Sequence, residues 1–341
     1  MPNLVVPFLL GAVLSLWACQ AGPPGVHQEP ALVKRSQMLM GTLVFVTAVA
    51  PQEETARRAA AAGLSEIRRL EELLSTWIPT SDLSRVNAEA GRAPVAVSHE
   101  TLDLLRQARE VAVMTEGGFN IAIGPAVEAW GFPEAPRLPS ADELRSVRPL
   151  IDLSRIQLDE KARTVYLALE GMRVDVGGIG KGFAADLAAE VMREAGATAG
   201  VVALSGDIKT FGRNPDGERF LFGIQDPRDE GMVLGRLELE DEAVSTAGDY
   251  QRFFVQDGVR YHHILDPETL LPVRRCRSVT VVAKTGVLAD GLDTGIFVMG
   301  PERGMALVER LEGVEAVIVD NAGEVLISSG LKERLKLLRR K

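Results

Sequence analysis

The sequence has few cysteines, no excess of positive charge and no hydrophobic run long enough to cross a membrane comfortably. Lysine and arginine number 38 against 47 aspartates and glutamates, a net charge of -9, and no basic stripe is interleaved with aromatic residues. A nucleic-acid-binding surface requires such a basic footprint, so this class of partner is excluded. The apolar run from Leu4 to Ala18 is uncharged, but Pro7 and Gly11 interrupt it, and it is too short for a comfortable membrane span.

This N-terminal run is typical of the apolar region of a signal peptide. It ends in Leu16-Trp-Ala-Cys19, which resembles a bacterial lipobox, because a small residue precedes the cysteine that would be lipidated. We therefore expect a lipoprotein signal peptide over 1–18 and a tether over 19–35. The expected location is the bacterial envelope, anchored to a membrane through the lipid on Cys19 and facing the periplasm or exterior. An ordinary secretory peptide and an uncleaved anchor remain the alternatives.

Lipidation of Cys19 would leave Cys276 as the one remaining thiol, so no intramolecular disulfide could form. The sequence neighbours of Cys276 are arginines, and none of them is a base. We interpret this cysteine as an inert residue at a strand end rather than a nucleophile.

What is present is the composition of a globular enzyme, with 46% hydrophobic and 25% charged residues in a chain of 341. This is enough to bury a large core, in one domain or two lobes. Apolar periodicity predicts an amphipathic helix over 53–74, and Ser98 is a typical N-cap of a second helix that Gly117 ends. Further helices are expected from Phe183 and from Asp290. Strands are expected over 41–49, 164–169, 200–204, 220–224, 278–283 and 314–319.

Strands and helices do not alternate strictly along the chain. This order predicts an α+β fold with mixed sheets flanked by helices, rather than a doubly wound parallel sheet. Residues 133–149, which contain several prolines, are expected to be a connection, and a junction between two lobes is one interpretation of it. The basic tail, 331–341, is expected to be a solvated, fraying terminus, with a short amphipathic helix on anionic lipid as the alternative.

The most informative segment is a glycine-rich turn that follows an apolar strand and opens into a helix, Val174-Asp-Val-Gly-Gly-Ile-Gly-Lys-Gly-Phe-Ala-Ala-Asp186. Glycines let backbone N–H groups approach a phosphate, the helix N-terminus favours an anion, and Lys181 supplies a cation. The spacing matches neither common nucleotide-binding motif. From these residues alone, a tight strand–helix turn without a ligand is an equally good interpretation.

Other motifs accompany this turn in a fixed order: Met40-Gly-Thr42, Ser75-Thr-Trp77, Ser81-Asp-Leu-Ser-Arg-Val-Asn87 and Gly117-Gly-Phe-Asn-Ile-Ala-Ile-Gly-Pro125 precede it, and His262-His-Ile-Leu-Asp-Pro267 and Ala289-Asp-Gly-Leu-Asp-Thr294 follow it. Together they resemble the ApbE family, the FAD:protein FMN transferases. The resemblance covers about residues 36–330, which we take as the flavin transferase domain. Its fold implies an active site in a cleft between two lobes.

The resemblance implies transfer of the FMN moiety of FAD to a threonine or serine hydroxyl of an acceptor protein, with release of AMP. Mg²⁺ would bridge the pyrophosphate and offset the charge of the transferred phosphoryl group. The implied partners are FAD as substrate and acceptor flavoproteins such as subunits of membrane electron-transport complexes. Two alternatives stay open: an exported FAD pyrophosphatase that forms FMN and AMP, and an FAD-binding carrier lipoprotein.

The metal hypothesis concerns Asp290 and Thr294. If their segment is helical, the i, i+4 spacing places two hard oxygen ligands on one face, as Mg²⁺ prefers. From the spacing alone, an aspartate at a helix start is more often a cap. The resemblance implies that both residues are metal ligands, together with the main-chain carbonyls of Gly180 and Asp293, which stand where alanine is usual.

His263 is the catalytic candidate. From the residues alone, a histidine at a strand end is usually a structural hydrogen-bonding residue. By family match, His263 would remove the proton of the attacking hydroxyl or bind the pyrophosphate, Asp290 is the competing base, and Lys181 assists. Asp266 is expected to orient a turn with Pro267. The usual Thr-Gly after this motif is here Thr269-Leu270.

Flavin recognition is expected mainly from the first half of the chain. Trp77 matches a family position that stacks on the isoalloxazine ring, although without the resemblance it would be interpreted as a core residue. Asn120 replaces the usual aspartate, and Leu204-Ser-Gly-Asp207 is a near-match to a family turn. The full set of expected FAD-binding residues is Met40, Trp77, Asn87, Asn120, Asp175, Gly177, Gly178, Lys181, Thr246 and His263.

Overall fold

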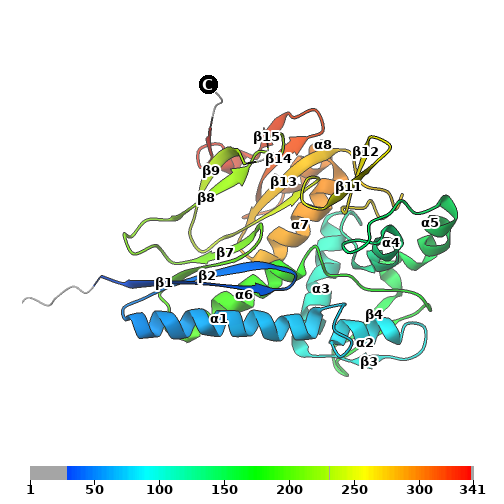
Figure 1. The fold of residues 1–341 in the computed structure, drawn as a ribbon, viewed down its shortest axis with the longest axis horizontal. Coiled ribbons are helices and arrows are strands. Elements are labelled where there is room, and N and C mark those ends of the chain that lie inside the picture. Colours follow the sequence, from blue (N-terminus) through cyan, green and yellow to red (C-terminus); the bar gives the residue numbers. More distant parts are fainter. Residues whose placement is uncertain (1–28, 230, 339–341) are drawn as a thin grey trace, which may run out of the picture.

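The computed structural model describes residues 29–229 and 231–338, in which helices pack against antiparallel sheets (Figure 1). The predicted signal peptide and Cys19 lie outside the described residues. The predicted α+β fold with helices flanking the sheets is confirmed, and every strand pairing found among the described residues is antiparallel, so these sheets are not mixed. No helix within the described ranges has the length and apolar character needed to cross a bilayer.

The main sheet has eight strands. Its first strand, β1, starts at Ala31 and pairs with β2 along its whole length, so residues 31–35 belong to the sheet rather than to the expected tether. The strands in spatial order are β1 (Ala31–Leu39), β2 (Thr42–Ala50), β6 (Ala199–Leu204), β7 (Asp207–Phe211), β10 (Ala243–Gly248), β13 (Cys276–Ala283), β14 (Glu315–Asp320) and β15 (Val325–Ile327).

Helices cover one face of this sheet. The predicted amphipathic helix is confirmed as α1 (Glu53–Leu74), whose buried residues include Leu64, Ile67 and Leu70. Ser98 is confirmed as the N-cap of α3, because its side chain accepts a hydrogen bond from Thr101 N. The helices that contact the sheet are α1, α6 (Gly180–Glu194), α7 (Gly286–Met299) and α8 (Pro301–Val308), and α3 (His99–Met114) packs against α7. The helices predicted from 183 and 290 thus start earlier, at Gly180 and Gly286.

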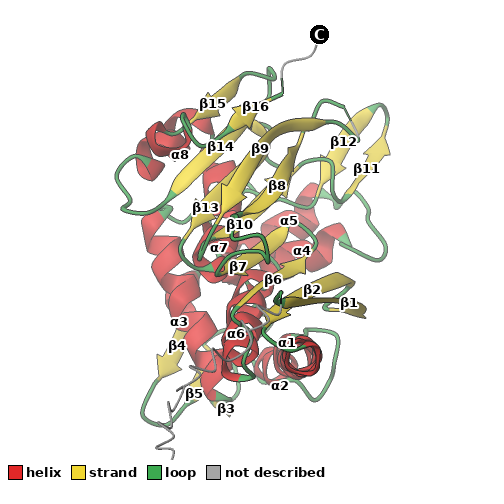
Figure 2. Ribbon diagram, turned by 90° about the vertical axis from the view of Figure 1, so that its left-hand side faces the viewer, coloured by secondary structure: helices red, strands yellow, loops and turns green. Residues whose placement is uncertain are grey.

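A second sheet covers part of the opposite face (Figure 2). It contains β16 (Lys336–Leu337), β9 (Val233–Leu239) and β8 (Phe220–Gln225) in that order. Ile224, Leu237 and Leu239 pack with Val244 and Val282 of the main sheet into an apolar cluster.

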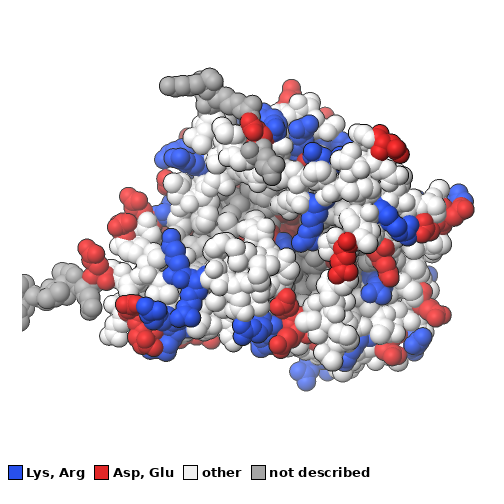
Figure 3. Space-filling model, in the orientation of Figure 1, with Lys and Arg blue, Asp and Glu red and all other residues white. Residues whose placement is uncertain are grey.

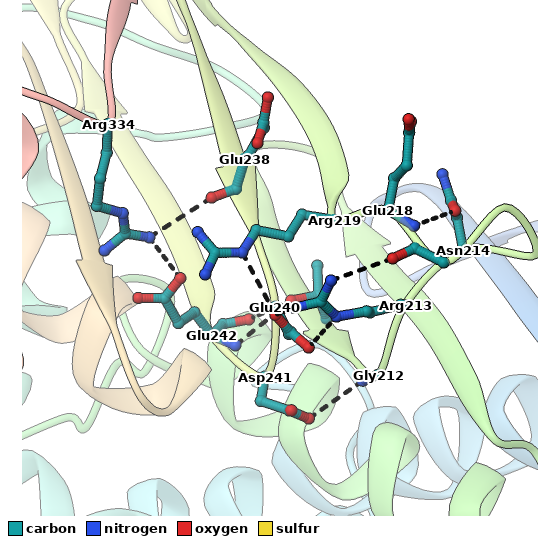
Figure 4. A network of polar contacts seen from close by, with 12 residues as sticks. Gly212, Arg213, Asn214, Glu218, Arg219, Glu238, Glu240, Asp241, Glu242 and Arg334 are labelled. Carbon is teal, nitrogen blue, oxygen red and sulfur yellow. Dashed lines mark hydrogen bonds and ion pairs between the residues drawn. The ribbon is translucent and has the colours of Figure 1, made fainter.

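The C-terminal segment is anchored to this second sheet, contrary to the expectation of a fraying end. Leu331 is buried in the apolar cluster, and Lys336 pairs with Arg236 in the β16–β9 ladder. Figure 4 shows Arg334 among the polar contacts beside β9, where it bonds Glu242. The segment is held because Leu331 and Leu335 both face the core. The many basic residues of the tail made this apolar spacing hard to recognise in the sequence.

Smaller elements complete the fold around the helical layer. Residues 133–149, expected to be a connection, contain α5, which starts with a complete capping box of Ser140 and Glu143. The remaining elements are α2 (Asp82–Ala88), α4 (Gly124–Trp130), α5 (Ala141–Val147), the sheet of β3 (Val95–Ala96), β5 (Thr164–Leu167) and β4 (Ile156–Asp159), the hairpin of β11 (Phe253–Gln256) and β12 (Val259–His262), and short 3-10 turns at Ile121–Ile123, Arg148–Leu150, Leu153–Arg155 and Ser329–Leu331.

Candidate active site

A cavity of about 1590 Å³ opens on the face of the molecule that Figure 3 shows hollowed near its centre. Elements from both halves of the chain line it, from the β1–β2 turn to helix α7. Every site residue predicted from the sequence lies on its wall: Met40, Trp77, Asn87, Asn120, Asp175, Gly177, Gly178, Gly180, Lys181, Thr246, His263, Asp290, Asp293 and Thr294.

The glycine-rich turn lies at the start of α6. Asp175 Oδ1 accepts a hydrogen bond of 2.7 Å from Gly177 N, which fixes the turn. A methyl group on Gly178 would approach Thr294 Oγ1 to 3.0 Å, so the turn lies against α7. No side chain of the N-cap residue bonds the first N–H groups of α6. Gly180 and Lys181 at the helix start line the cavity, so the positive end of the α6 dipole lies beside it.

Asn87 holds the strand that leads into this turn. Its side-chain amide donates to Val174 O at 3.0 Å and accepts from Val174 N at 2.7 Å. This pairing satisfies buried backbone groups just before the glycines. The side chain of Asn87 thus positions the turn, in addition to lining the cavity.

Helices α6 and α7 approach each other closely at two glycines. A Cβ atom on Gly182 would lie 2.1 Å from Gly286 O, so no side chain fits there. Asp290 Oδ2 accepts a 2.8 Å hydrogen bond from Gly182 N. Asp290 therefore caps α6 rather than its own helix. The second glycine of the Gly-Lys-Gly sequence, Gly182, is required by the packing of the two helices.

Three buried carboxylates form the acidic centre of the cavity. Oxygen atoms of Asp207, Asp290 and Asp293 lie within 4.8 Å of one another. Burial, with the neighbouring charge of Asp207, raises the pKa of Asp290 to about 7. Burial and Asp290 likewise raise the pKa of Asp293 well above its ordinary value. Such a set of hard oxygen atoms suits a divalent cation.

Lys181 and Ser245 contact the same centre. Lys181 Nζ forms an ion pair with Asp207. Although burial opposes its charge, Asp207 and Asp290 raise the pKa of Lys181, so the side chain remains a cation. Ser245 Oγ, which is buried, lies between Asp207 and Asp293, 2.6 Å from Asp293 Oδ2.

Asp207 was missed as a ligand candidate by sequence reasoning. It follows β6 at a two-residue turn, and its segment matches the family turn without the usual second glycine. The alternation along β7 was the available signal: Asp207 and Lys209 are buried polar residues on the helix side of the sheet.

The two adjacent histidines have different environments. His262 is buried, its Nε2 lies 2.5 Å from Val273 O, and its ring packs edge-on against Phe297. His263 is half-buried and lines the cavity, with its Nδ1 3.3 Å from Arg252 O. Burial, followed by the charge of Arg252, lowers the pKa of His263 to about 3, so the ring is neutral at neutral pH. His262 is the structural histidine and His263 the one that faces the site.

The turn after His263 keeps its shape despite the missing glycine. Asp266 Oδ1 accepts from Glu268 N at 2.9 Å, as expected for a residue that orients a turn. Leu270 adopts the left-handed conformation with φ 63°, its side chain is fully buried, and its carbonyl accepts from Trp130 Nε1 at 2.8 Å. Burial of the leucine side chain and this hydrogen bond offset the backbone strain.

The opposite end of the cavity is aromatic and open. Trp77 is 62% exposed, so it is not a core residue, and its ring is available to a flat ligand. Met40 lies in the β1–β2 turn, where its N–H donates to Glu71 Oε1 at 2.6 Å. Asn120 Oδ1 accepts from Ala122 N at 2.8 Å, and Thr246 Oγ1 lies 2.9 Å from Thr280 Oγ1. These two polar groups are held locally at the cavity wall.

The ApbE family model matches residues 40–318 of this sequence. The chain belongs to the ApbE family. Among curated relatives, the FAD:protein FMN transferase of Vibrio cholerae is 38% identical over 250 residues, which cover 71% of this chain and 74% of the relative. The FAD:protein FMN transferase of Treponema pallidum is 32% identical over 344 residues, covering 96% of this chain and 95% of the relative.

Solved structures agree with the family assignment. The ApbE protein of Thermotoga maritima matches this ApbE chain with a TM-score of 0.84 and 31% identity, covering 89% of this chain and 99% of that one. The flavin transferase ApbE of Vibrio cholerae matches with a TM-score of 0.81 and 32% identity, with the same coverage. The resemblance predicted from the ordered motifs is thus confirmed.

Proposed function

We propose that this protein is an FAD:protein FMN transferase that moves the FMN moiety of FAD to a serine or threonine hydroxyl of an acceptor protein and releases AMP. The main observation that supports this proposal is that all the predicted site residues line one cavity. Family membership and the names of the relatives support the same activity. The cavity combines an aromatic platform, a phosphate-binding turn and an acidic centre, which are the parts that a flavin dinucleotide requires.

Mg²⁺ fits the acidic centre. Three buried carboxylates converge, and the ion pair found for them among the described residues is the one between Lys181 and Asp207, so further positive charge stabilises the cluster. Asp290 and Thr294 would hold the ion, with the carbonyls of Gly180 and Asp293 and with Asp207 nearby. A bound Mg²⁺ would neutralise charge on the pyrophosphate and on the leaving phosphate.

The protein's own groups then position the substrate. The glycine-rich turn and Lys181 line the part of the cavity that would hold the pyrophosphate, and Trp77 stacks on the flavin ring. The acceptor oxygen forms a bond to the FMN-side phosphorus as the pyrophosphate bond to AMP breaks. The hydroxyl proton passes to a base, for which neutral His263 is available and Asp290 is the competitor. Positioning and charge stabilisation dominate such transfers.

Membrane attachment is a separate part of the proposal. The lipobox-like sequence that ends at Cys19 supports lipid anchoring in the bacterial envelope, with the enzyme facing the periplasm or exterior. Anchoring there would bring it to acceptors that are subunits of membrane electron-transport complexes. Metabolic labelling with a radioactive fatty acid, compared between wild type and Cys19→Ala, tests the attachment.

The activity is tested by incubating the protein with FAD, Mg²⁺ and envelope proteins of the host, followed by intact mass analysis. We expect one FMN mass on an acceptor serine or threonine and an equal amount of AMP. AMP with free FMN and no labelled protein would identify a pyrophosphatase. Intact FAD after incubation with every acceptor fraction would identify a carrier.

A further inference from the structure

The second sheet covers only part of the face of the main sheet that lies opposite the helices. Directly opposed residues of neighbouring strands share a face, and register pairs Val244 with Ile208, Ile208 with Ala203, and Ala203 with Phe45. Val244 is buried beneath β8 and β9, whereas Phe45, at the other end of the same row, is 53% exposed. Figure 2 shows β1 and β2 extending beyond the edge of the second sheet.

The part of this face that the second sheet leaves uncovered, on β1 and β2, is an exposed apolar surface. Leu43 lies two residues before Phe45 on the same face of β2, and Met38 is the register partner of Leu43. Met38 is 65% exposed and Leu43 is 43% exposed. We call Met38, Leu43, Phe45 and Ala203 the β2 ledge.

Beside the β2 ledge lies β8, the edge strand of the second sheet. In the described part of the chain, β8 pairs with β9 on one side and has no strand on the other. Four consecutive residues of β8, Phe222–Gln225, line the cavity. Side chains of consecutive strand residues alternate between faces, so a continuous run that lines a cavity turns the strand's edge toward it. Such an edge offers unpaired N–H and C=O groups.

The β2 ledge and the edge of β8 both reach the active-site cavity. Met40–Thr42, at the end of the ledge, line the same cavity as β8. A protein acceptor must bring its hydroxyl to the pyrophosphate through this opening. Elements that would bind an extended polypeptide therefore lie beside the point where its hydroxyl has to react.

We infer that an extended segment of the acceptor protein binds here as one further strand, hydrogen-bonded to β8 and lying on the β2 ledge. This inference rests on the proposed transferase function. Main-chain bonds to β8 hold the segment, and apolar side chains at alternate positions cover Phe45 and its neighbours. The recognised acceptor is an unfolded loop or terminus whose hydroxyl residue is flanked by apolar residues at period two.

The enzyme side is tested with Phe45→Glu, which places a charge on the β2 ledge, outside the FAD-binding residues. The probe is a pool of peptides about ten residues long, each with a central threonine, long enough for one strand. For the peptide of this pool that wild type labels best, we expect the KM of Phe45→Glu to rise about tenfold, with kcat and FAD binding little changed. The matched control is Val113→Glu on α3, since Val113 is 74% exposed and lies outside the cavity lining. It should behave as wild type.

The peptide side is tested by N-methylation of the best-labelled peptide, one residue at a time. A strand donates N–H groups to one neighbour at every second residue, so labelling should fall at alternate positions and persist between them. Loss without alternation, or an unchanged KM in Phe45→Glu, would overturn the docking mode while leaving the transferase intact.

Two further outcomes are decisive. Wild-type enzyme that binds FAD but labels neither peptides nor envelope proteins would overturn the transferase function and the docking mode together. Sedimentation that shows a dimer of wild type, dissociated by Phe45→Glu, would assign the ledge to a second copy of the chain and overturn acceptor docking.

Discussion

Asp186 and Asp290 each cap the helix to which the other belongs. Asp290 of α7 accepts from Gly182 N in α6 at 2.8 Å, and Asp186 of α6 accepts from Gly286 N at 2.7 Å and from Val287 N at 3.0 Å at the start of α7. Each carboxylate also lies at the positive end of the other's helix dipole. These hydrogen bonds hold the two helices together where the glycine-rich turn meets the acidic centre, so they fix the relative position of these two parts.

This contact makes Gly182 sensitive to the smallest side chain. Gly182→Ala would drive a methyl group into the Gly286 carbonyl, and we expect a loss of about 3 kcal/mol in the free energy of unfolding. Gly180→Ala is the control, because its Cβ would meet the Val176 side chain at 3.4 Å and alanine favours a helix. Urea unfolding compares the two. Equal stability of both variants would contradict the close approach.

The proposed metal site predicts that activity and metal-dependent stability are lost together. Asp290→Asn keeps an oxygen that accepts from Gly182 N but removes the charge that would bind Mg²⁺. We expect FMN transfer to disappear, and the rise of the melting temperature on adding Mg²⁺ to disappear with it. Asp142→Asn, at an exposed surface acid, should retain both effects. A normal Mg²⁺ response in Asp290→Asn would place the ion elsewhere.

Exposure of Trp77 predicts a binding effect without a stability effect. Trp77→Ala should weaken FAD binding about tenfold, because the stacking surface is lost, while the melting temperature of the free protein stays unchanged. Trp77→Phe, which keeps a ring, should restore most of the affinity. Fluorescence titration measures the binding. An unchanged dissociation constant in Trp77→Ala would remove the residue from the flavin site.

The paired histidines give opposite expectations. His263→Ala should fold and bind FAD but label the acceptor much more slowly, since its ring faces the cavity. His262→Ala should instead lower the free energy of unfolding by about 2 kcal/mol, because the buried ring packs on Phe297 and bonds Val273 O. Single-turnover labelling and thermal melting separate these effects. The reverse pattern would exchange the two roles.

The pH dependence follows from the depressed pKa of His263, about 3 against an ordinary 6.5. A base with this value is already neutral well below pH 6, so the ring should take up no proton between pH 7 and about pH 5. The ring resonances of His263 in NMR spectra should likewise stay in the neutral form over this range. A titration midpoint near 6.5 would show that the ring is in contact with water rather than enclosed by the cavity.

Local sequence patterns predicted the elements whose periodicity and caps lie within the element itself. Helix α1 was predicted over its observed range because its apolar stripe and flanking polar residues are local. The starts of α6 and α7 were placed too late, because Gly182 and Gly286 have low helix propensity and are retained for a contact between helices that no local pattern contains. The C-terminal strand was missed for a similar reason, since its partner β9 lies far away in the chain.

The membership of the site could be predicted because the motifs matched a family, whereas their contacts could not. Trp77 was assigned to the flavin platform by resemblance, and its exposure is a property of the fold. Asp207 and Ser245 join the acidic centre only because β7 and β10 bring them beside α7. Such convergence depends on sheet order, which residue types do not specify.

The wall of the cavity begins at Met40 and is completed by Thr294, with contributions from nearly every part of the chain between them. During synthesis, the ribosome has released the flavin platform and the glycine-rich turn long before α7 exists. A chain that stops short of Asp290 lacks the cap of α6 and two members of the acidic centre. We therefore expect tight FAD binding only after the chain has been synthesised through α7, so that a nascent chain ending before Asp290 would not hold the dinucleotide.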